Sequence, residues 1–222
     1  MTLDPDSARR KMIQQQIRCW NVSNPRVLNA LQTVPREHFV AAEFAALAFA
    51  DTRLPIDAST SKTMLTPQLE GRILQALDPG PDDKVLEVGT GSGYLTACLA
   101  RLARHVTSID VSPARIEAAE ARLADLGITN CELQVQDVYE RREATSYDVI
   151  AVTGSIAAYD PRFEQWLNPG GRAFIVVGTA PAMEACLIVQ AVDGGTRVES
   201  LFETVVPPLT IAGNAAEPAF RF

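Results

Sequence analysis

A glycine-rich turn between an apolar strand and an apolar helical pattern is the segment of this chain best suited to bind a ligand. Gly89, Gly91 and Gly93 follow directly after a predicted strand over residues 84–88. Glycines at such a turn allow unusual backbone angles and let a ligand approach the backbone closely. About twenty residues later a second predicted strand ends at Asp110, whose carboxylate can accept hydrogen bonds from ribose hydroxyls. The two features together predict a nucleoside-type cofactor.

The charge beside the turn indicates which nucleoside is bound. Glu87 stands two residues before the first glycine, where its negative charge disfavours a phosphate and suits a sulfonium and an ammonium group. The glycine spacing also differs from the dinucleotide pattern, and no phosphate-loop motif occurs in the sequence. We therefore predict S-adenosylmethionine rather than NAD or ATP. Asp137, which follows the third predicted strand, is expected to reach the adenine amino group, with an ordinary loop aspartate as the alternative.

Alternating strands and helices after the turn cluster Pro79–Asp83 predict an α/β fold with a mainly parallel sheet and helices on both faces. The last two strands are expected to be antiparallel neighbours across the turn at residues 193–195. A helix is expected to begin at Ser112 and Pro113, and residues 168–171 are expected to form a tight turn. The seven strands are predicted over residues 84–88, 106–109, 131–135, 149–153, 173–177, 187–191 and 202–206.

The chain is predicted to divide at this turn cluster into two parts. Residues 1–78 form a helical extension with a substrate loop, and residues 79–222 form the cofactor-binding domain. Met12, Ile13, Ile17 and Trp20 indicate one amphipathic helix, and further helices are expected after Asn24 and Thr66. The long hydroxyl-rich loop over residues 57–66 is expected to lie over the cofactor, because long loops of this kind are commonly functional.

Composition limits the partners and the compartment. The chain has 222 residues, 47% of them hydrophobic, and a net charge of −7, which favours one sizeable core and argues against a nucleic-acid-binding face. No membrane span and no signal peptide are expected. The four scattered cysteines are expected to be reduced, which fits the cytoplasm, and His38 and His105 have no partners that predict a metal site. Arg36, Arg53 and Lys62 are candidates to attract an anionic acceptor.

Over nearly its whole length the sequence resembles the protein-L-isoaspartate (D-aspartate) O-methyltransferase family. The string Val-Pro-Arg-Glu-His-Phe-Val at residues 34–40 and the string Gly-Thr-Gly-Ser-Gly-Tyr at residues 89–94 are specific to it in this order. The resemblance implies a Rossmann-like class I methyltransferase fold, S-adenosylmethionine as donor, and isoaspartyl-containing proteins or peptides as substrates of a cytoplasmic repair reaction. Further matching segments are residues 12–17, 25–28, 54–56, 86–88, 148–153 and 206–209.

The sequence departs from the family pattern at the acceptor motif. Leu65 stands where the family has a serine that lines the acceptor site, and a leucine side chain cannot donate a hydrogen bond. We expect Leu65 to limit activity on isoaspartyl substrates, with Thr66 either supplying a hydroxyl or capping a helix. Two alternatives therefore stay open: the same fold and donor with another acceptor, or a cofactor-binding protein without transfer activity.

The expected chemistry needs few specialised groups. A carboxylate acceptor is already a nucleophile at neutral pH, so alignment and exclusion of water suffice without a general base. Thr153, at the end of the fourth predicted strand, either lines the reaction site or belongs to a turn. The predicted catalytic residues are Leu65, Thr66 and Thr153. The predicted cofactor-binding residues are Glu87, Gly89, Thr90, Gly91, Ser92, Gly93, Asp110, Val111, Asp137 and Val138.

Overall fold

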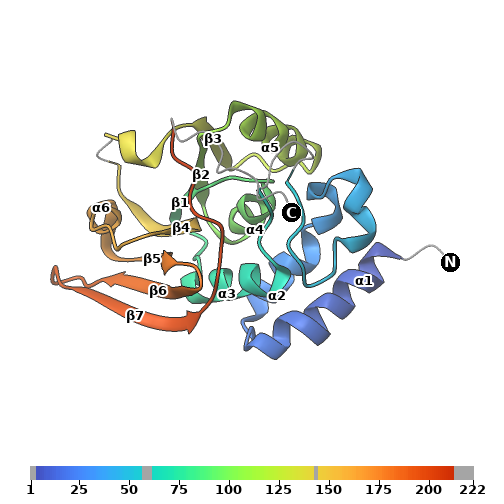
Figure 1. Cartoon of the computed structure of the whole chain (residues 1–222), viewed down its shortest axis with the longest axis horizontal. Coiled ribbons are helices and arrows are strands. Elements are labelled where there is room, and N and C mark those ends of the chain that lie inside the picture. The colour runs from blue at the N-terminus through green and yellow to red at the C-terminus, as the bar shows by residue number, and fades with distance from the viewer. Residues whose placement is uncertain (1–3, 57–61, 143–144, 213–222) are drawn as a thin grey trace.

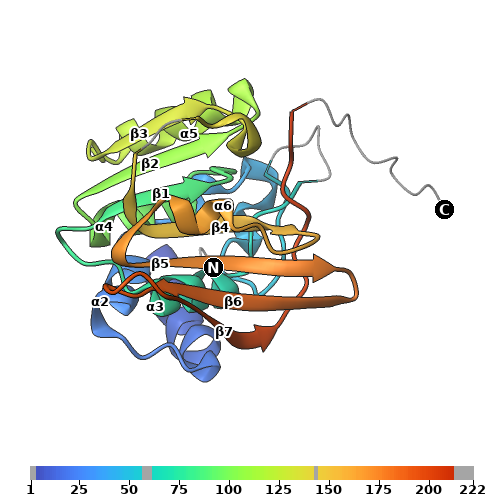
Figure 2. The same ribbon diagram turned by 90° about the vertical axis from the view of Figure 1, so that its left-hand side faces the viewer.

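A seven-stranded sheet forms the centre of the protein in a computed structural model, which describes residues 4–56, 62–142 and 145–212. The strand order is β3-β2-β1-β4-β5-β6-β7, with parallel pairing from β3 to β5 and antiparallel pairing from β5 to β7 (Figures 1 and 2). The strands are β1 (Lys84–Val88), β2 (His105–Asp110), β3 (Cys131–Val135), β4 (Tyr147–Ile156), β5 (Leu167–Thr179), β6 (Ala182–Gln190) and β7 (Thr196–Glu203).

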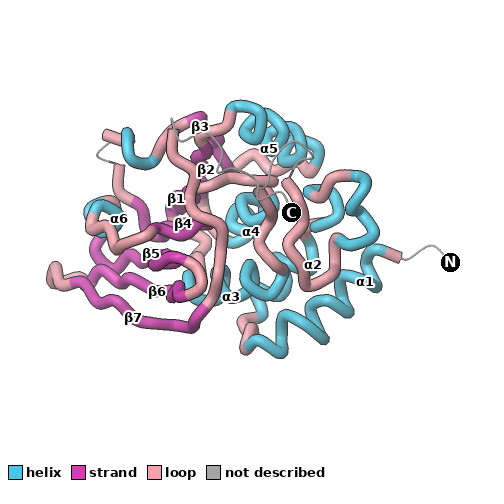
Figure 3. Tube along the Cα trace, in the orientation of Figure 1, coloured by secondary structure: helices cyan, strands magenta, loops and turns pink. Residues whose placement is uncertain are grey.

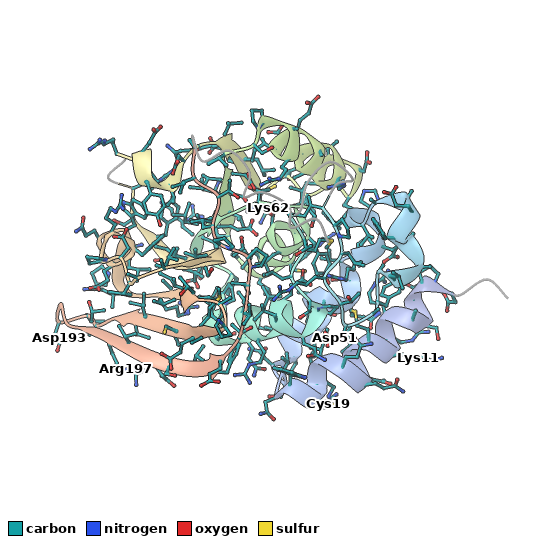
Figure 4. The ribbon with its side chains drawn as sticks, viewed as in Figure 1. Lys11, Cys19, Asp51, Lys62, Asp193 and Arg197 are labelled. Atoms are coloured by element: carbon teal, nitrogen blue, oxygen red, sulfur yellow. The ribbon has the colours of Figure 1, made fainter. Side chains whose placement is uncertain are left out.

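All seven predicted strands are present, and the antiparallel pairing of the last two is confirmed. Asp193, labelled in Figure 4, marks the far end of the hairpin that joins them. β5 and β6 are antiparallel as well, because only residues 180–181 join them, and a parallel crossover needs a much longer connection. The last strand lies earlier in the chain than predicted, since it runs from Thr196 to Glu203 and residues 204–206 lie outside it.

The predicted turn at residues 168–171 is wrong as a separate element, because these residues lie within β5. They form an irregularity in which the register shifts from the pair Tyr147 and Leu167 to the pair Val149 and Arg172. Gly170 adopts a φ of 82°, and these turn-forming residues therefore form a bulge within the strand.

Three longer helices pack on one face of the sheet. They are α3 (Pro67–Leu77), α4 (Tyr94–Leu102) and α5 (Pro113–Asp125). The predicted start of α5 is confirmed, since Ser112 Oγ accepts a hydrogen bond from the amide of Arg115 at 3.4 Å with Pro113 at the first helical position. Each helix presents an apolar stripe to the sheet, which fixes the positions of the turns that precede α4 and α5.

Alternate residues of the strands point to two different apolar layers. In β1, Val85 faces the layer containing α3 and α4, whereas Leu86 faces a second layer that includes Phe163. The second layer is covered by the short helix α6 (Arg162–Gln165) and the 3-10 turn η5 (Val138–Glu140). The prediction of helices on both faces is therefore confirmed, although the second face carries only short ones.

The helical extension lies to one side of the sheet (Figure 3). Met12, Ile13 and Ile17 are buried as predicted, but Trp20 is 48% exposed, because the helix changes its winding before it reaches Trp20. Buried residues of the extension and of the sheet belong to one continuous hydrophobic core. The extension comprises α1 (Pro5–Met12), the π turn η1 (Ile13–Ile17), the 3-10 turns η2 (Arg18–Trp20), η3 (Arg36–Phe39) and η4 (Ala42–Leu47), and α2 (Pro25–Thr33).

Within the described residues, no helix has the length and hydropathy that crossing a bilayer requires.

Candidate cofactor and acceptor site

A cleft lies at the carboxyl ends of the parallel strands and holds about 830 Å³ of free space, part of it open to solvent. Binding sites of open α/β sheets occupy this position. Its walls come from the turn after β1, the ends of β2 and β4, residues 62–65 and residues 207–210. Lys62, labelled in Figure 4, belongs to this lining. The cleft thus brings the predicted cofactor turn and the predicted acceptor segment together.

Most of the predicted site residues lie in this cleft. Leu65 and the glycine turn share it, although they are far apart in the sequence. Three predicted residues are not part of its lining: Thr66, Gly93 and Asp137. The predicted residues that do line it are Leu65, Glu87, Gly89, Thr90, Gly91, Ser92, Asp110, Val111, Val138 and Thr153.

The turn after β1 requires its glycines for two separate reasons. Gly89 has a φ of 97°, and a Cβ at this position would collide with Thr153 Oγ1. Gly91 has a φ of 56°, and a Cβ there would meet Ile56 Cδ1 at 3.3 Å on the cleft side. The side chain of Thr153 stabilises the turn, because its hydroxyl donates to the carbonyls of Val88 at 3.0 Å and Gly89 at 2.8 Å. Thr153 therefore supports the turn as well as lining the cleft.

Glu87 is fully buried beneath the glycine turn and contributes to the cleft lining. One carboxylate oxygen, Oε2, accepts hydrogen bonds from Thr96 and, at 2.6 Å, from Ser108. The other oxygen, Oε1, has no hydrogen-bond partner in the described part of the chain. Burial raises the pKa of the carboxyl to about 7, against the two hydroxyl hydrogen bonds that lower it. The free oxygen is suited to a cationic ligand, because a buried polar atom is costly when unpaired.

Asp110 ends β2 and is held by the start of α5. Its carboxylate accepts from the amides of Gly91 at 3.1 Å and Ser112 at 3.0 Å, and from Arg115 Nη1 at 3.1 Å. Arg115 also lines the cleft, and reasoning from the sequence missed it. The sequence did contain a signal for Arg115, because it lies in the first turn of the helix that follows Asp110. The pair presents both an acceptor and a donor to the cleft, as a ribose needs.

Asp137 is not among the residues that line the cleft, and its contact with the adenine amino group stays a prediction. Its two oxygens accept from the backbone amides of Tyr139 at 2.8 Å and Ala212 at 2.6 Å. Its neighbours Gln136 and Val138 line the cleft instead. Asp137 thereby ties the segment after β7, residues 204–212, to the end of β3.

Residues 204–212, which we call the strap, run along the edge of the sheet (red in Figure 2). The amide of Ser155 donates to the carbonyl of Pro207 at 3.0 Å, and the amide of Leu209 donates to the carbonyl of Ser155 at 2.9 Å. Gly154 allows this close approach, since a Cβ there would lie 2.7 Å from Leu209 Cα. The strap thus forms one wall of the cleft, and the sequence did not predict it.

The acceptor end of the cleft is formed by residues 62–65, which pair with residues 54–56. The amide of Met64 donates to the carbonyl of Leu54 at 2.7 Å, and the amide of Ile56 donates to the carbonyl of Lys62 at 3.0 Å. Leu65 is 9% exposed and lines the cleft. The rest of the predicted loop, residues 57–61, lies outside the described residues.

The threonine that lines this end of the cleft is Thr63 rather than Thr66. Thr63 lines the cleft, and its Oγ1 is buried with no hydrogen-bond partner among the described residues. Thr66 instead caps α3, where its hydroxyl accepts from the amide of Leu69 at 3.4 Å, and it lines a different pocket. The predicted role of Thr66 as a replacement donor is therefore wrong in its placement, and the helix-cap interpretation is confirmed.

Arg36 is fully buried, so it cannot attract an acceptor from solvent as predicted. Its guanidinium pairs with Glu70, donates to the carbonyls of Leu65 and Ala48 at 2.9 Å each, and lies 4.8 Å from the ring centroid of Tyr94. Burial raises the pKa of Glu70 to about 7 despite the arginine. Arg36 fixes the backbone of the acceptor segment from inside the core. The described residues contain no group of three His, Cys, Asp or Glu side chains placed to hold a metal ion.

The fold and the site define a class: a Rossmann-like methyltransferase of class I. Its glycine turn, buried glutamate and strand-end aspartate occupy one cleft at the carboxyl edge of a parallel sheet. The sequence model of the protein-L-isoaspartate (D-aspartate) O-methyltransferase family matches residues 7–212, and the chain belongs to this family.

Relatives of similar length support the assignment. A protein-L-isoaspartate O-methyltransferase of Koribacter versatilis is 36% identical over 95% of this chain and 94% of its own length. One of Paracoccus denitrificans is 37% identical over 94% of this chain and 97% of its own length.

Two solved structures show the same fold. One, from Plasmodium falciparum in complex with S-adenosyl-L-homocysteine, has a TM-score of 0.78 at 18% identity and covers 94% of this chain and 99% of that chain. Another, of a protein-L-isoaspartate O-methyltransferase, has a TM-score of 0.79 at 24% identity and covers 90% of this chain and 65% of that chain. They confirm the fold class predicted from the sequence.

Proposed function

We propose that this protein transfers the methyl group of S-adenosylmethionine to the carboxylate of isoaspartyl residues in damaged proteins. The observation that carries the proposal is a single cleft lined both by the glycine turn after β1 and by the acceptor segment, residues 62–65. Membership of the family, matched over residues 7–212, supports the same donor and acceptor.

The residues of the cleft fit S-adenosylmethionine. Glu87 offers a buried carboxylate oxygen that has no partner among the described residues, and Asp110 and Arg115 offer an acceptor and a donor beside the turn. Gly91 leaves the backbone open to the cleft. When bound, S-adenosylmethionine supplies an electrophilic methyl group on a positively charged sulfur.

The protein contributes orientation and exclusion of water. Apolar side chains of the lining, among them Ile56, Met64, Leu65 and Leu209, make the acceptor end poor in water. An isoaspartyl carboxylate is ionised at neutral pH, so no residue has to remove a proton from it. Positioning of this carboxylate and removal of its water on binding then lower the barrier to transfer. Thr63, whose Oγ1 is buried without a hydrogen-bond partner among the described residues, is our candidate to donate a hydrogen bond to the carboxylate, which Leu65 cannot do.

Incubation with S-adenosylmethionine labelled in its methyl group and an isoaspartyl peptide tests the proposal. We expect label in the peptide as a base-labile methyl ester. Transfer only to other acceptors, such as molecules of a cell extract, would support the same fold and donor with a different acceptor. Binding of the cofactor without any transfer would support a cofactor-binding protein.

We also propose that the substrates are proteins of a reducing compartment such as the cytoplasm. The described cysteines, Cys19, Cys98, Cys131 and Cys186, are all free thiols, which supports this setting.

A further inference from the structure

A second pocket lies next to the acceptor end of the cleft, on the other side of the Leu65–Thr66 peptide. It holds about 580 Å³ of free space, part of it open to solvent. Its lining includes Trp20, Arg53, Thr66, Arg72 and Phe202. None of these side chains lines the cleft, although the sequence indicated Arg53 as a candidate to attract an anionic acceptor and Thr66 as a catalytic candidate.

The charge of this pocket is positive in an otherwise acidic protein. Arg53 and Arg72 contribute two guanidinium groups, and no carboxylate side chain belongs to the lining. Neither arginine lies within ion-pair distance of a carboxylate in the part of the chain that the structure describes. By contrast, Arg9, Arg36 and Arg115 each pair with an acidic side chain.

Contacts with neighbouring groups orient both arginines. Arg72 lies with its guanidinium carbon 4.4 Å from the ring centroid of Phe202 and donates to the carbonyl of Trp20 at 3.1 Å. Arg53 donates to the carbonyl of Val205. Each contact leaves other N–H groups of the guanidinium available, because arginine carries five donors. A fixed guanidinium with free donors loses little conformational freedom when it binds a carboxylate.

Three chain segments lead directly from this pocket into the cleft. Arg53 precedes the pairing segment 54–56, Thr66 follows the acceptor segment 62–65, and Val205 precedes strap residues 207–210. The pocket is thus separated from the cleft by at most two intervening residues along each of these segments, which is within reach of residues that flank an isoaspartyl residue at the acceptor end.

We propose that this pocket binds an acidic side chain, aspartate or glutamate, that flanks the isoaspartyl residue of the polypeptide substrate. The inference rests on the proposed function and adds a preference among substrates. Arginine recognises carboxylates through paired hydrogen bonds, and the aromatic surfaces of Trp20 and Phe202 suit the aliphatic part of such a side chain.

Steady-state kinetics with three sets of isoaspartyl peptides test this subsite. The peptides share one core and carry glutamate, alanine or lysine at each position up to three residues before or after the isoaspartyl residue. For at least one of these positions we expect the glutamate peptide to have a KM about fivefold below that of the alanine peptide, and the lysine peptide to have a higher KM. The difference should shrink as salt is added, because the pocket is open to solvent.

Variants of Arg72 separate recognition from a structural effect. Arg72→Gln should remove the KM difference between glutamate and alanine peptides, and Arg72→Glu should reverse it in favour of lysine. A general loss of structure cannot reverse a preference. Arg101→Gln, at an exposed arginine of α4, is the matched control and should keep the wild-type ratio.

The outcomes distinguish the two levels of the account. If the wild-type protein methylates no peptide of any set, the proposed function itself fails. If it methylates all three sets with equal KM at every position, or if Arg72→Glu leaves the ratio unchanged, the function stands and the acidic subsite is overturned.

Discussion

Thr63 is the residue to which our proposal assigns recognition of the acceptor carboxylate. Its hydroxyl is buried, has no partner among the described residues and belongs to the cleft lining. Thr63→Val keeps the shape of the side chain and removes one hydrogen bond, at a cost of about 1–3 kcal/mol if the partner oxygen is left buried and unpaired. We expect kcat/KM for an isoaspartyl peptide to fall about tenfold or more, and Thr63→Ser to retain activity. Full activity of Thr63→Val would show that this hydroxyl has no part in transfer.

Leu65 marks the place where a second hydroxyl can be added. Leu65→Ser should raise transfer to the isoaspartyl peptide, up to about a hundredfold if it recovers the whole cost of an unpaired acceptor oxygen. It should also restore activity to Thr63→Val. The matched control is Leu65→Ala, which shortens the side chain similarly without adding a donor. Equal activities of the serine and alanine variants would contradict this view of the acceptor end.

Glu87 makes the stability of the fold depend on pH. Burial raises its pKa to about 7 in the folded protein, whereas the unfolded carboxyl titrates near 4.5. Between these values the unfolded chain binds fewer protons than the folded one, so the free energy of unfolding falls as the pH rises, by roughly 3 kcal/mol at most. Glu87→Gln has no such titration, so its stability relative to wild type should increase from pH 5 to pH 8.

Urea unfolding without cofactor at several pH values measures this difference. Glu117→Gln, at an exposed carboxyl of α5, is the control and should follow the wild-type profile. Parallel profiles for wild type and Glu87→Gln would show that Glu87 is not protonated on folding.

At the scale of elements, the strap closes the cleft because Gly154 lets it approach β4. A Cβ at this position would lie 2.7 Å from Leu209 Cα and 2.8 Å from Leu209 N, so Gly154→Ala must displace the strap. We expect the dissociation constant for S-adenosylhomocysteine to rise about tenfold, since overpacking of this kind costs on the order of 1–3 kcal/mol. Calorimetric titration measures it. Gly195→Ala is the control, because its Cβ would meet only Asp193 Oδ1, at 3.9 Å. Unchanged affinity in Gly154→Ala would exclude the strap from cofactor binding.

The sequence correctly predicted the elements that depend on interactions between residues close together in the chain. The glycine turn, the Ser112 cap and the apolar strands follow from residues close together in the chain. The contacts of Asp137 and Arg36 could not be predicted from nearby residues. Their partners, Ala212 and Glu70, lie far from them in the sequence. The bulge at Gly170 shows the same limit, since turn-forming residues can also distort a strand.

At the scale of the whole molecule, the extension and the sheet form one body around one core. Buried residues of α2 and α3 pack in the same cluster as Val85 of β1 and Leu99 of α4. Arg36 connects the extension to the acceptor segment as well, because it pairs with Glu70 of α3 and donates to the carbonyl of Leu65. The cofactor turn and the acceptor segment therefore line one cleft of a single packed body, and an aligned methyl transfer requires such fixed positions.

The central claim is that this cleft methylates isoaspartyl carboxylates, and a comparison of two isomeric peptides tests it most directly. The peptides have the same sequence and differ only in whether one residue is isoaspartyl or ordinary aspartyl. Transfer of labelled methyl from S-adenosylmethionine is followed as a function of peptide concentration. The account predicts saturable transfer to the isoaspartyl peptide and none above background to the aspartyl one. Equal transfer to both peptides, or transfer to neither by a protein that binds the cofactor, would contradict it.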